Sequence, residues 1–471
     1  MPSTPPRLER GPTAVEQGVA LVTLATVPRY DSDRTIERGG RAVVVGAGMA
    51  GLLAARVLAD AFDEVTVLER DPTPDEPVTR RGVPQGRHIH VMLEAGRATL
   101  EDLFPGYRED LLSAGGLEID GACDVEFYAA GGFLADGHHR LPQFAATRPL
   151  YEQLVRRNVV DLDGVHLRSR CQVKGYLVNE TAATVEGVSF TNEERAVEEL
   201  DATLVVDATG RASRTPGWLE RQGYPSPTVD EVYIDLAYST VLLERSSDDR
   251  QAFIVPPEPP RTRGFGMFPV EDGRSIATLG GVHGDHPPTD ADELKEFAAR
   301  IPGLDVKQLL ESRPWISEEV THYPFPSNLR RRYEDLDQFP EGLIVVGDGI
   351  ASFNPLYGQG MSVAALESLL LHDCLATCGL EELAPQFFAR CKEIVDVAWM
   401  VAVGSDVRFP ETTGLKPHGT GLVSRYMARL HRKAQADGSL REAFTRVLMM
   451  EQPPETLFHP RIVWRVLKPT L

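Results

Sequence analysis

Cysteines, basic residues and long apolar runs are all scarce in this sequence of 471 residues. The five cysteines, odd in number and at no disulfide-framework spacing, favour a reducing compartment. The formal charge of −20 disfavours nucleic acid as a partner and favours a soluble protein that stays apart from anionic membranes, because like charges repel. The apolar run at 18–27 is far shorter than the roughly 20 residues of a membrane-spanning helix, and Glu9 and Glu16 before it are unlike a signal peptide. We therefore expect a cytoplasmic protein with no integral membrane segment.

Several catalytic and metal-binding motifs are also absent. The sequence contains neither the H-E-x-x-H motif of zinc proteases nor the G-x-S-x-G elbow of serine hydrolases. His88 and His90 form a His-x-His pair, but no third ligand stands at a suitable spacing. A loop position or helix capping therefore explains both histidines better than a metal site does. The sequence has no internal repeat, and its length favours two or three globular domains.

The order of predicted helices and strands indicates a mixed α/β chain. Residues 1–40, rich in proline, arginine, threonine and glutamate, predict a flexible arm. Between residues 41 and 68 a buried strand, a helix and a second strand form a βαβ unit, which implies a parallel sheet. A further helix is predicted to begin near His90. Residues 226–325 have alternating strands between proline-rich loops, which is typical of an antiparallel sheet, and the chain from Met361 onward is predicted to be largely helical.

A glycine-rich motif stands between the first predicted strand and helix. In the spacing G-x-G-x-x-G, the first glycine permits a tight turn, the second lets the backbone approach a pyrophosphate, and the third lets helix and strand pack closely. The helix N-terminus then holds the phosphates through free N–H groups and its dipole. Glu69 ends the second strand, at the distance where a carboxylate binds the hydroxyls of a ribose. The motif alone does not separate NAD from FAD. Its residues, all predicted to bind the dinucleotide, are Gly46, Ala47, Gly48, Met49, Ala50 and Gly51.

A second segment distinguishes between these cofactors. A predicted strand ends in Gly347-Asp348, where the carboxylate can accept hydrogen bonds from a ribityl chain. Two later glycines let backbone N–H groups face a flat ring at a helix N-terminus, whose dipole stabilises negative charge on a reduced flavin. Taken alone, Asp348 could be a helix or loop cap, and the glycines could be ordinary turn residues. Both halves, in order after a Rossmann opening, favour FAD. The residues predicted to contact the flavin are Asp348, Pro355, Gly358, Gly360 and Met361.

Three segments in sequence order resemble the group A flavoprotein monooxygenases, the class of para-hydroxybenzoate hydroxylase. They are Gly46–Gly51 with Glu69-Arg70, the strand end Asp207-Ala-Thr-Gly210, and Gly347-Asp348 with Pro355–Met361. The loop Arg80-Arg81-Gly82-Val83-Pro84-Gln85 and the segment Asn354–Gly358 are closest to the flavin epoxidases of polyether antibiotic pathways and their bacterial relatives. The likeness covers residues 41–405. It implies further FAD contacts at Arg70, Arg81, Gly82, Arg148, Val173, Asp207 and Gly210.

This resemblance implies an FAD-dependent monooxygenase. Reduced flavin would take up O2 as a C4a-hydroperoxide and deliver one oxygen atom to a hydrophobic organic substrate, by epoxidation or hydroxylation. Attack on an olefin would strictly require no catalytic side chain. NAD(P)H would be a transient electron donor; a separate flavin reductase is the alternative, because only one nucleotide fingerprint is present. In the wider class the middle motif pairs Asp directly with Gly, whereas Ala208-Thr209 separates them here, which leaves the donor open. The Trp-x-Trp-x-Ile-Pro signature of the related halogenases is absent.

Two other functions remain open: a flavin-dependent reductase of isoprenoid double bonds, and a flavoprotein that binds FAD and a partner without catalysis. The expected fold class is α/β, with a Rossmann-like FAD-binding domain, an inserted antiparallel β-sheet substrate domain and a C-terminal helical region. After the arm at 1–40, the FAD-binding parts are expected at 41–115, 147–225 and 326–375, the substrate-domain strands at 116–146 and 226–325, and the helical region at 376–471.

The predicted substrate sheet supplies the candidate substrate contacts. Phe265, Met267 and Phe268 are expected to line an apolar cavity, although the core of a sheet is an equally good position for each of them. The tail at 461–468 is amphipathic and basic. A helix docked on the protein itself fits this tail better than a membrane contact does.

Overall fold

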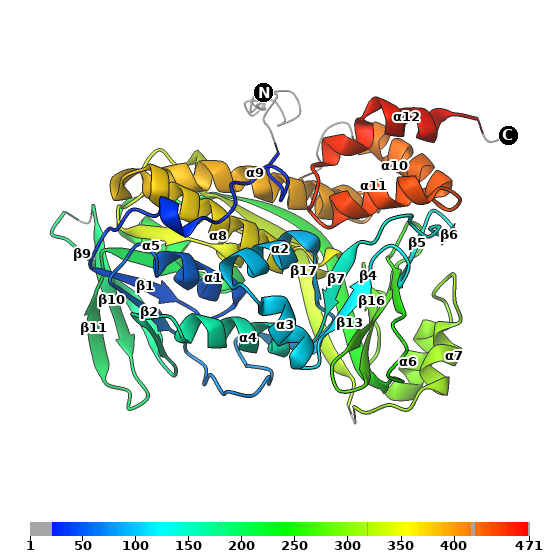
Figure 1. The fold of residues 1–471 in the computed structure, drawn as a ribbon, viewed down its shortest axis with the longest axis horizontal. Helices are drawn as coiled ribbons and strands as arrows, with labels where there is room; N and C mark the ends of the chain where they lie inside the picture. Colours follow the sequence, from blue (N-terminus) through cyan, green and yellow to red (C-terminus); the bar gives the residue numbers. More distant parts are fainter. Residues whose placement is uncertain (1–20, 182, 318, 416–419, 470–471) are drawn as a thin grey trace, which may run out of the picture.

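The structure is a computed structural model that describes residues 21–181, 183–317, 319–415 and 420–469 (Figure 1). The predicted parallel sheet is present, with its strands in the order β18-β12-β1-β2-β8 and every neighbouring pair parallel. Val43 and Val44 are fully buried because both faces of the sheet are covered, so the strand is a continuous apolar run. The strands are β1 (Arg41–Val45), β2 (Glu64–Leu68), β8 (Val165–Arg168), β12 (Leu204–Asp207) and β18 (Leu343–Val345).

Helices and a small antiparallel sheet surround this parallel sheet. Helix α8 packs against α1, α2 and α9, and nearly all of its residues are buried, polar ones such as Glu367 and His372 included. The helices are α1 (Met49–Leu58), α2 (Glu94–Leu103), α3 (Tyr107–Ser113), α4 (Arg148–Val160), α5 (Thr215–Arg221), α8 (Gly360–Thr377) and α9 (Leu380–Asp406). The small sheet is formed by β9 (Gln172–Val178), β10 (Val185–Thr191) and β11 (Val197–Asp201).

A large, mainly antiparallel sheet forms the second part of the molecule, in the order β19-β17-β13-β16-β15-β14-β5-β6, with β20 paired to β13. Its long strands β13 and β17 pair with each other and extend to the parallel sheet. There the Arg331 N–H donates a hydrogen bond to the Ile350 carbonyl, just after β18. The strands are β5 (Val125–Ala129), β6 (Gly132–Phe133), β13 (Thr228–Glu244), β14 (Ala252–Val255), β15 (Arg263–Val270), β16 (Arg274–Gly281), β17 (Thr321–Arg332), β19 (Ala351–Ser352) and β20 (Thr413–Gly414).

Both faces of the large sheet are covered. Helices α6 (Ala291–Ala298) and α7 (Val306–Ser312) share one hydrophobic cluster with it, and the sheet β3-β7-β4 shares another. The strands of that sheet are β3 (Val91–Met92), β7 (Pro142–Ala145) and β4 (Leu117–Asp120). This arrangement confirms the predicted fold class of an α/β domain with an inserted antiparallel sheet.

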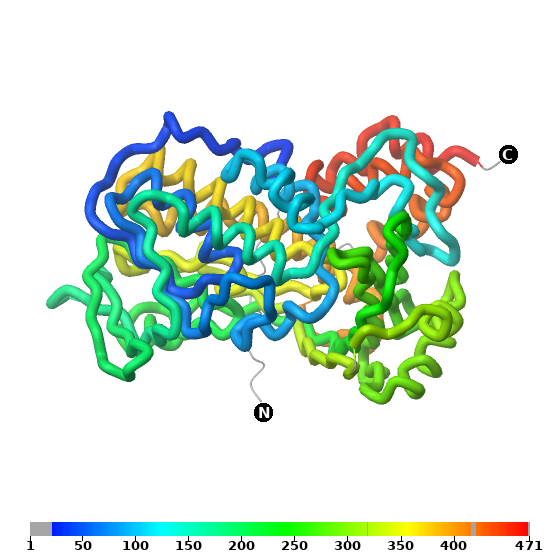
Figure 2. Tube along the Cα trace, turned by 60° about the horizontal axis from the view of Figure 1, so that its bottom comes forward, coloured from blue at the N-terminus to red at the C-terminus, as the bar shows by residue number. Residues whose placement is uncertain are grey.

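The last part of the chain is helical, as predicted, and lies beside the strands β5 and β6 (Figures 1 and 2). It contains α10 (Thr420–Ala434), α11 (Gly438–Leu448), the short 3-10 helix η7 (Pro454–Phe458) and α12 (Pro460–Leu467). Leu430, Leu440 and Val466 pack in one cluster with Ala129 and Leu134. In the described part of the chain, no helix is both long and apolar enough to cross a membrane.

Two local predictions are wrong. Residues 21–40, assigned to a flexible arm, pack on the protein: Leu21 and Val27 are buried, and the Leu24 N–H bonds the Met450 carbonyl at 3.1 Å. The average composition of 1–40 conceals this short apolar stretch; residues 1–20 lie outside the described residues. The helix predicted near His90 begins at Glu94, because the preceding residues pair as β3 with β7.

Candidate functional site

The glycine-rich motif forms the turn between β1 and α1. Gly46 has a φ of +106°, a conformation that side chains disfavour. A Cβ on Gly51 would lie 1.9 Å from the Gly46 carbonyl oxygen, so only glycine allows this close helix–strand packing. A Cβ on Gly48 would meet no atom within 4 Å, because this residue faces open space at the N-terminus of α1. The turn therefore offers a ligand free backbone N–H groups at a helix N-terminus.

Glu69 and Arg80 form a buried pair beside this turn. The Glu69 carboxylate accepts the Ala47 and Asp71 N–H groups, both at 2.9 Å, and lies 2.9 Å from Arg80 Nη1. Arg80 also donates to the Ala47 carbonyl and to the carboxylate of Glu152. Burial opposes the charged form of Arg80, but the two carboxylates outweigh it and raise its pKa. Sequence reasoning chose Arg81, which lines the same space from an exposed position, and missed Arg80.

In the middle motif, the Asp207 carboxylate points into the loop that follows it. Asp207 accepts hydrogen bonds from the Thr209 N–H (2.9 Å) and from the Ser213 (2.6 Å) and Thr215 (2.5 Å) hydroxyls. This network accommodates the two residues that separate Asp207 from Gly210. The Arg211 guanidinium, in the same loop, donates hydrogen bonds to the carbonyl and hydroxyl of Ser327 in β17, at 2.8 Å each.

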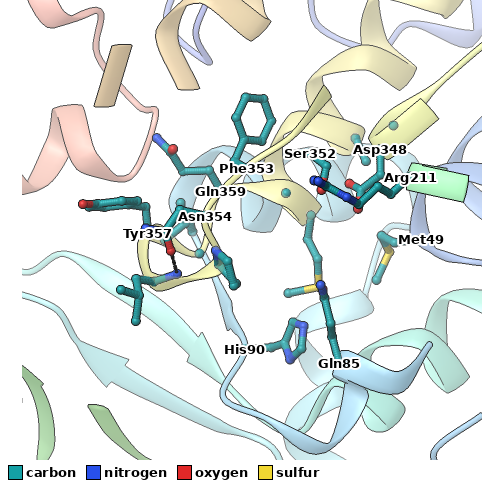
Figure 3. Close-up of a pocket in the computed structure, with 18 of the residues that line it drawn as sticks. Met49, Gln85, His90, Arg211, Asp348, Ser352, Phe353, Asn354, Tyr357 and Gln359 are labelled. Carbon is teal, nitrogen blue, oxygen red and sulfur yellow. Dashed lines mark hydrogen bonds between the residues drawn. The ribbon is translucent and has the colours of Figure 1, made fainter. Parts of the chain in front are cut away.

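Asp348 follows β18 and lies close to Arg211 (Figure 3). Burial raises the pKa of Asp348, while Arg148, Arg211 and Arg331 act to lower it. Beneath it, the Glu367 carboxylate accepts the Gly347 N–H at 2.6 Å, and burial raises the pKa of Glu367 to about 7. Arg211 and Glu367 were both missed from the sequence, because their roles depend on contacts between distant segments.

A buried polar network holds the segment Asn354–Gly358. Asp406, at the end of α9, accepts hydrogen bonds from the side-chain amides of Asn328 (2.8 Å) and Asn354 (2.9 Å) and from the Tyr357 hydroxyl (3.4 Å). Burial raises the pKa of Asp406 to about 7, against these three hydrogen bonds, which lower it. Asn354 in turn caps the following turn by accepting the Leu356 N–H at 3.1 Å (Figure 3). The network therefore fixes the backbone that leads to the N-terminus of α8.

All these elements border one cavity of about 1220 Å³. Of the predicted cofactor residues, Ala47 and Gly51 are not in its lining; they shape the turn from behind. Of the predicted substrate residues, Met267 is not in the lining either, because it is fully buried in the core under α6 and α7. The predicted residues that the cavity brings together are Gly46, Gly48, Met49, Ala50, Glu69, Arg70, Arg81, Gly82, Arg148, Val173, Asp207, Gly210, Asp348, Pro355, Gly358, Gly360, Met361, Phe265 and Phe268.

The far end of the cavity has a mostly apolar wall with a few polar groups. His88 Nδ1 lies 2.7 Å from Thr240 Oγ1, which lies 2.6 Å from Thr278 Oγ1. Burial lowers the pKa of His88 to about 3, so the ring is neutral near pH 7. Its Nε2 is buried with no partner among the described residues. The C-terminal helices supply much of the remaining wall, including His431, whose pKa burial lowers to about 4, and Phe444.

The cavity fits FAD. It exceeds the roughly 300–1,000 Å³ of a usual small-molecule pocket. Glu69, the turn at Gly48 and Asp348 follow the strands β2, β1 and β18, which stand in this order across the parallel sheet. This is the order of adenosine, pyrophosphate and ribityl chain in a bound dinucleotide. The Gln359 amide at that N-terminus is buried, with neither polar atom partnered by a described residue, as expected where a ligand completes the site.

Comparison with known proteins agrees with this fit. Residues 41–382 match the family model described as an FAD binding domain. The Mycobacterium tuberculosis protein Rv3254 is 34% identical over 388 residues, which is 79% of this chain and 81% of that protein. Kynurenine 3-monooxygenase of Salinispora tropica is 26% identical over 360 residues, 72% of this chain and 73% of the enzyme. The crystal structure of pqsL, a probable FAD-dependent monooxygenase from Pseudomonas aeruginosa, superposes with a TM-score of 0.60 at 16% identity, covering 79% of this chain and 98% of that one.

The fold and site define an FAD-dependent oxidoreductase of the group A flavoprotein monooxygenase class, as the three sequence segments predict. The chain belongs to the FAD-binding domain family, and FAD is its cofactor. Kinship with the polyether epoxidases stays a prediction.

Proposed function

We propose that this protein inserts one oxygen atom from O2 into a hydrophobic organic substrate, by hydroxylation or epoxidation. The observation that carries the proposal is the single cavity that joins the cofactor residues to an apolar chamber. Phe268 contributes to this chamber from β15, and Phe127, Ile254, Met427 and Phe444 contribute from neighbouring elements. Phe265 also borders the cavity, but its side chain packs on the core face of β15 with Met267. Such a wall selects an apolar substrate and excludes water from the reacting atoms.

The chain's own residues hold the reactants in place. The α1 N-terminus and Gly48 bind the pyrophosphate, Asp348 accepts hydrogen bonds from the ribityl chain, and the N-terminus of α8 stabilises negative charge at the ring. When bound and reduced, FAD supplies the activation of O2. The neutral His88, held by Thr240, offers its unpartnered Nε2 to a polar group of the substrate. No side chain is assigned as an acid or a base.

NAD(P)H is the proposed electron donor, visiting transiently. The Rossmann turn that borders the cavity, Gly46–Gly51, is already assigned to FAD. This supports a donor that binds without a nucleotide-binding domain of its own. A separate flavin reductase is the alternative. Stopped-flow measurement of flavin bleaching by NADH or NADPH under argon tests the donor, and failure of both would favour the reductase.

Isotope labelling tests the oxygen transfer. FAD-loaded protein, photoreduced so that donor identity does not matter, is mixed with ¹⁸O2 and a panel of isoprenoid olefins and alkylphenols, with free FAD as the control. We expect a product that carries one ¹⁸O atom and is absent under argon. Products that instead gain two hydrogens under argon, with no ¹⁸O in air, would contradict the proposal and favour an isoprenoid reductase.

A further inference from the structure

Helix α12 has two apolar faces, of which one is docked. Ile462 and the fully buried Val466 pack into the cluster formed with α10 and α11, so the tail forms a helix docked on the protein, as the sequence predicts. Trp464 and Leu467 point outward, with exposed fractions of 66% and 53%. With Pro460 and Val463 they follow the i, i+3, i+4, i+7 spacing of one helical stripe. The Lys468 ammonium lies 5.3 Å from the centroid of the Trp464 ring, and this contact leaves most of the outer stripe exposed.

This stripe continues onto neighbouring elements. Phe458 is 46% exposed and stacks on Tyr426 of α10, with ring centroids 5.0 Å apart. The first turn of α10 adds Leu422, exposed by 75%, and Val423, exposed by 46%. A shallow groove bordered by Phe458, Pro460, Val463, Trp464, Leu467 and Lys468 shows that the α12 part is contiguous. We call the whole set the C-terminal apolar surface: Leu422, Val423, Phe458, Pro460, Val463, Trp464 and Leu467.

The charge around this surface is opposite to that of the whole chain. Residues 420–469 contain nine lysines and arginines against four aspartates and glutamates, whereas the chain carries −20. Arg425, Arg432, Arg461 and Lys468 are exposed on the same helices. An apolar stripe with a tryptophan, flanked by basic side chains, is the pattern of a helix that lies in the interface of an anionic membrane.

The C-terminal apolar surface adjoins the cavity. Val423 and Phe458 are exposed, yet both also line the cavity, so the cavity reaches the molecular surface beside this patch. Ser424, Met427 and Leu457 continue the wall inward from there. An apolar molecule that leaves a bilayer at this surface would therefore enter the chamber without crossing water.

We propose that the C-terminal apolar surface binds peripherally to an anionic lipid bilayer. A second copy of the chain is a poorer occupant, because a two-fold interface would bring two basic surfaces together. The whole-chain charge disfavours such binding, but attraction to a surface decays within a Debye length of about 8–10 Å, so the local charge decides. That substrate enters from the bilayer rests on the proposed function; the membrane contact does not.

Vesicle sedimentation tests the contact on the full-length holoprotein. Phosphatidylcholine vesicles with about 30% phosphatidylglycerol should bind the protein, and pure phosphatidylcholine should bind it at least about tenfold more weakly. Trp464→Ser should weaken the anionic-vesicle partition about tenfold. Val197→Ser removes an apolar side chain that is 70% exposed on β11 and should change nothing. Unchanged FAD content and melting temperature establish that both variants are folded.

The outcomes are decisive without any turnover assay. Binding to anionic vesicles that Trp464→Ser weakens and Val197→Ser spares supports the proposal. Absence of binding to anionic vesicles, or equal loss in both variants, overturns it. A concentration-dependent dimer that Trp464→Ser abolishes, measured by light scattering, overturns it in favour of a second copy. Because no step requires oxygen transfer, failure here leaves the proposed function standing.

Discussion

Gly48 and Gly51 belong to one motif, yet one added methyl group should affect them in opposite ways. At Gly48 the backbone (φ −78°, ψ 178°) suits alanine, and the new Cβ meets nothing within 4 Å. Alanine is the poorer helix cap by up to about 1 kcal/mol, but it restricts the unfolded chain by about 0.4–1 kcal/mol. The free energy of unfolding of the apoprotein should therefore change by less than about 0.5 kcal/mol in Gly48→Ala.

Binding of FAD should respond quite differently. The methyl group occupies the space where the backbone approaches the pyrophosphate, and loss of one hydrogen bond to a charged group costs about 1.5–3 kcal/mol. The FAD Kd of Gly48→Ala should rise roughly 10- to 150-fold, measured by flavin fluorescence on the apoprotein. Gly51→Ala, whose Cβ would lie 1.9 Å from the Gly46 oxygen, should instead lose at least about 3 kcal/mol of stability in urea. Wild-type FAD affinity in Gly48→Ala would refute the placement of the pyrophosphate, and wild-type stability in Gly51→Ala would refute the packing argument.

Three further predictions concern buried polar groups. Arg80→Met leaves the buried Glu69 without its cation and takes from Glu152 the nearest of three arginines, so it should cost about 3–5 kcal/mol in urea unfolding, whereas Arg81→Ala should stay within about 0.5 kcal/mol; equal losses would contradict this. Asp406→Asn keeps one acceptor oxygen and sets its amide N–H2 against that of either Asn328 or Asn354, so FAD dissociation followed by fluorescence should accelerate about tenfold; an unchanged rate would remove the network's positioning role. Burial lowers the pKa of His431 from 6.5 to about 4. The stability gained from keeping this ring neutral is therefore fully present above about pH 6.5, and it is lost as the pH falls from there through 4. The difference in unfolding free energy between wild type and His431→Phe should therefore shift by up to about 1.4 kcal/mol per pH unit in that window, and a constant difference would contradict the burial argument.

The cofactor half of the site is predictable from sequence because its signals are local. The turn at Gly46 and the close packing at Gly51 each demand glycine for reasons that involve only adjacent elements. The strand before Asp348 is a short apolar run that ends in Gly-Asp, which is likewise readable without the fold. Because the strands are parallel, their carboxyl ends, which carry the glycine-rich turn and Asp348, lie at the same edge of the sheet.

The sequence does not show which of two adjacent side chains faces the site. Arg80 and Arg81 are adjacent in an irregular loop, and only the fold shows that Arg80 turns inward to Glu69. Met267 and Phe268 point to opposite faces of β15 because side chains alternate along a strand, and both faces are buried, so apolar character marks neither. Asp406 is 52 residues from Asn354, and no local pattern foretells their contact.

The region beyond the family match is what closes the site. The match to the FAD binding domain ends at residue 382, but Ser405, Arg408, His431 and Phe444 complete the far wall of the cavity. Asp406 from the same region fixes the loop that leads to the flavin end of the cavity. The family thus accounts for the cofactor, while the chamber that must choose the substrate is finished by helices outside it. The solved structure at 16% identity shows the fold alone, so it does not specify the substrate. The same helices carry the C-terminal apolar surface, so under the two proposals one region would set both what the chamber accepts and the side from which substrate reaches it.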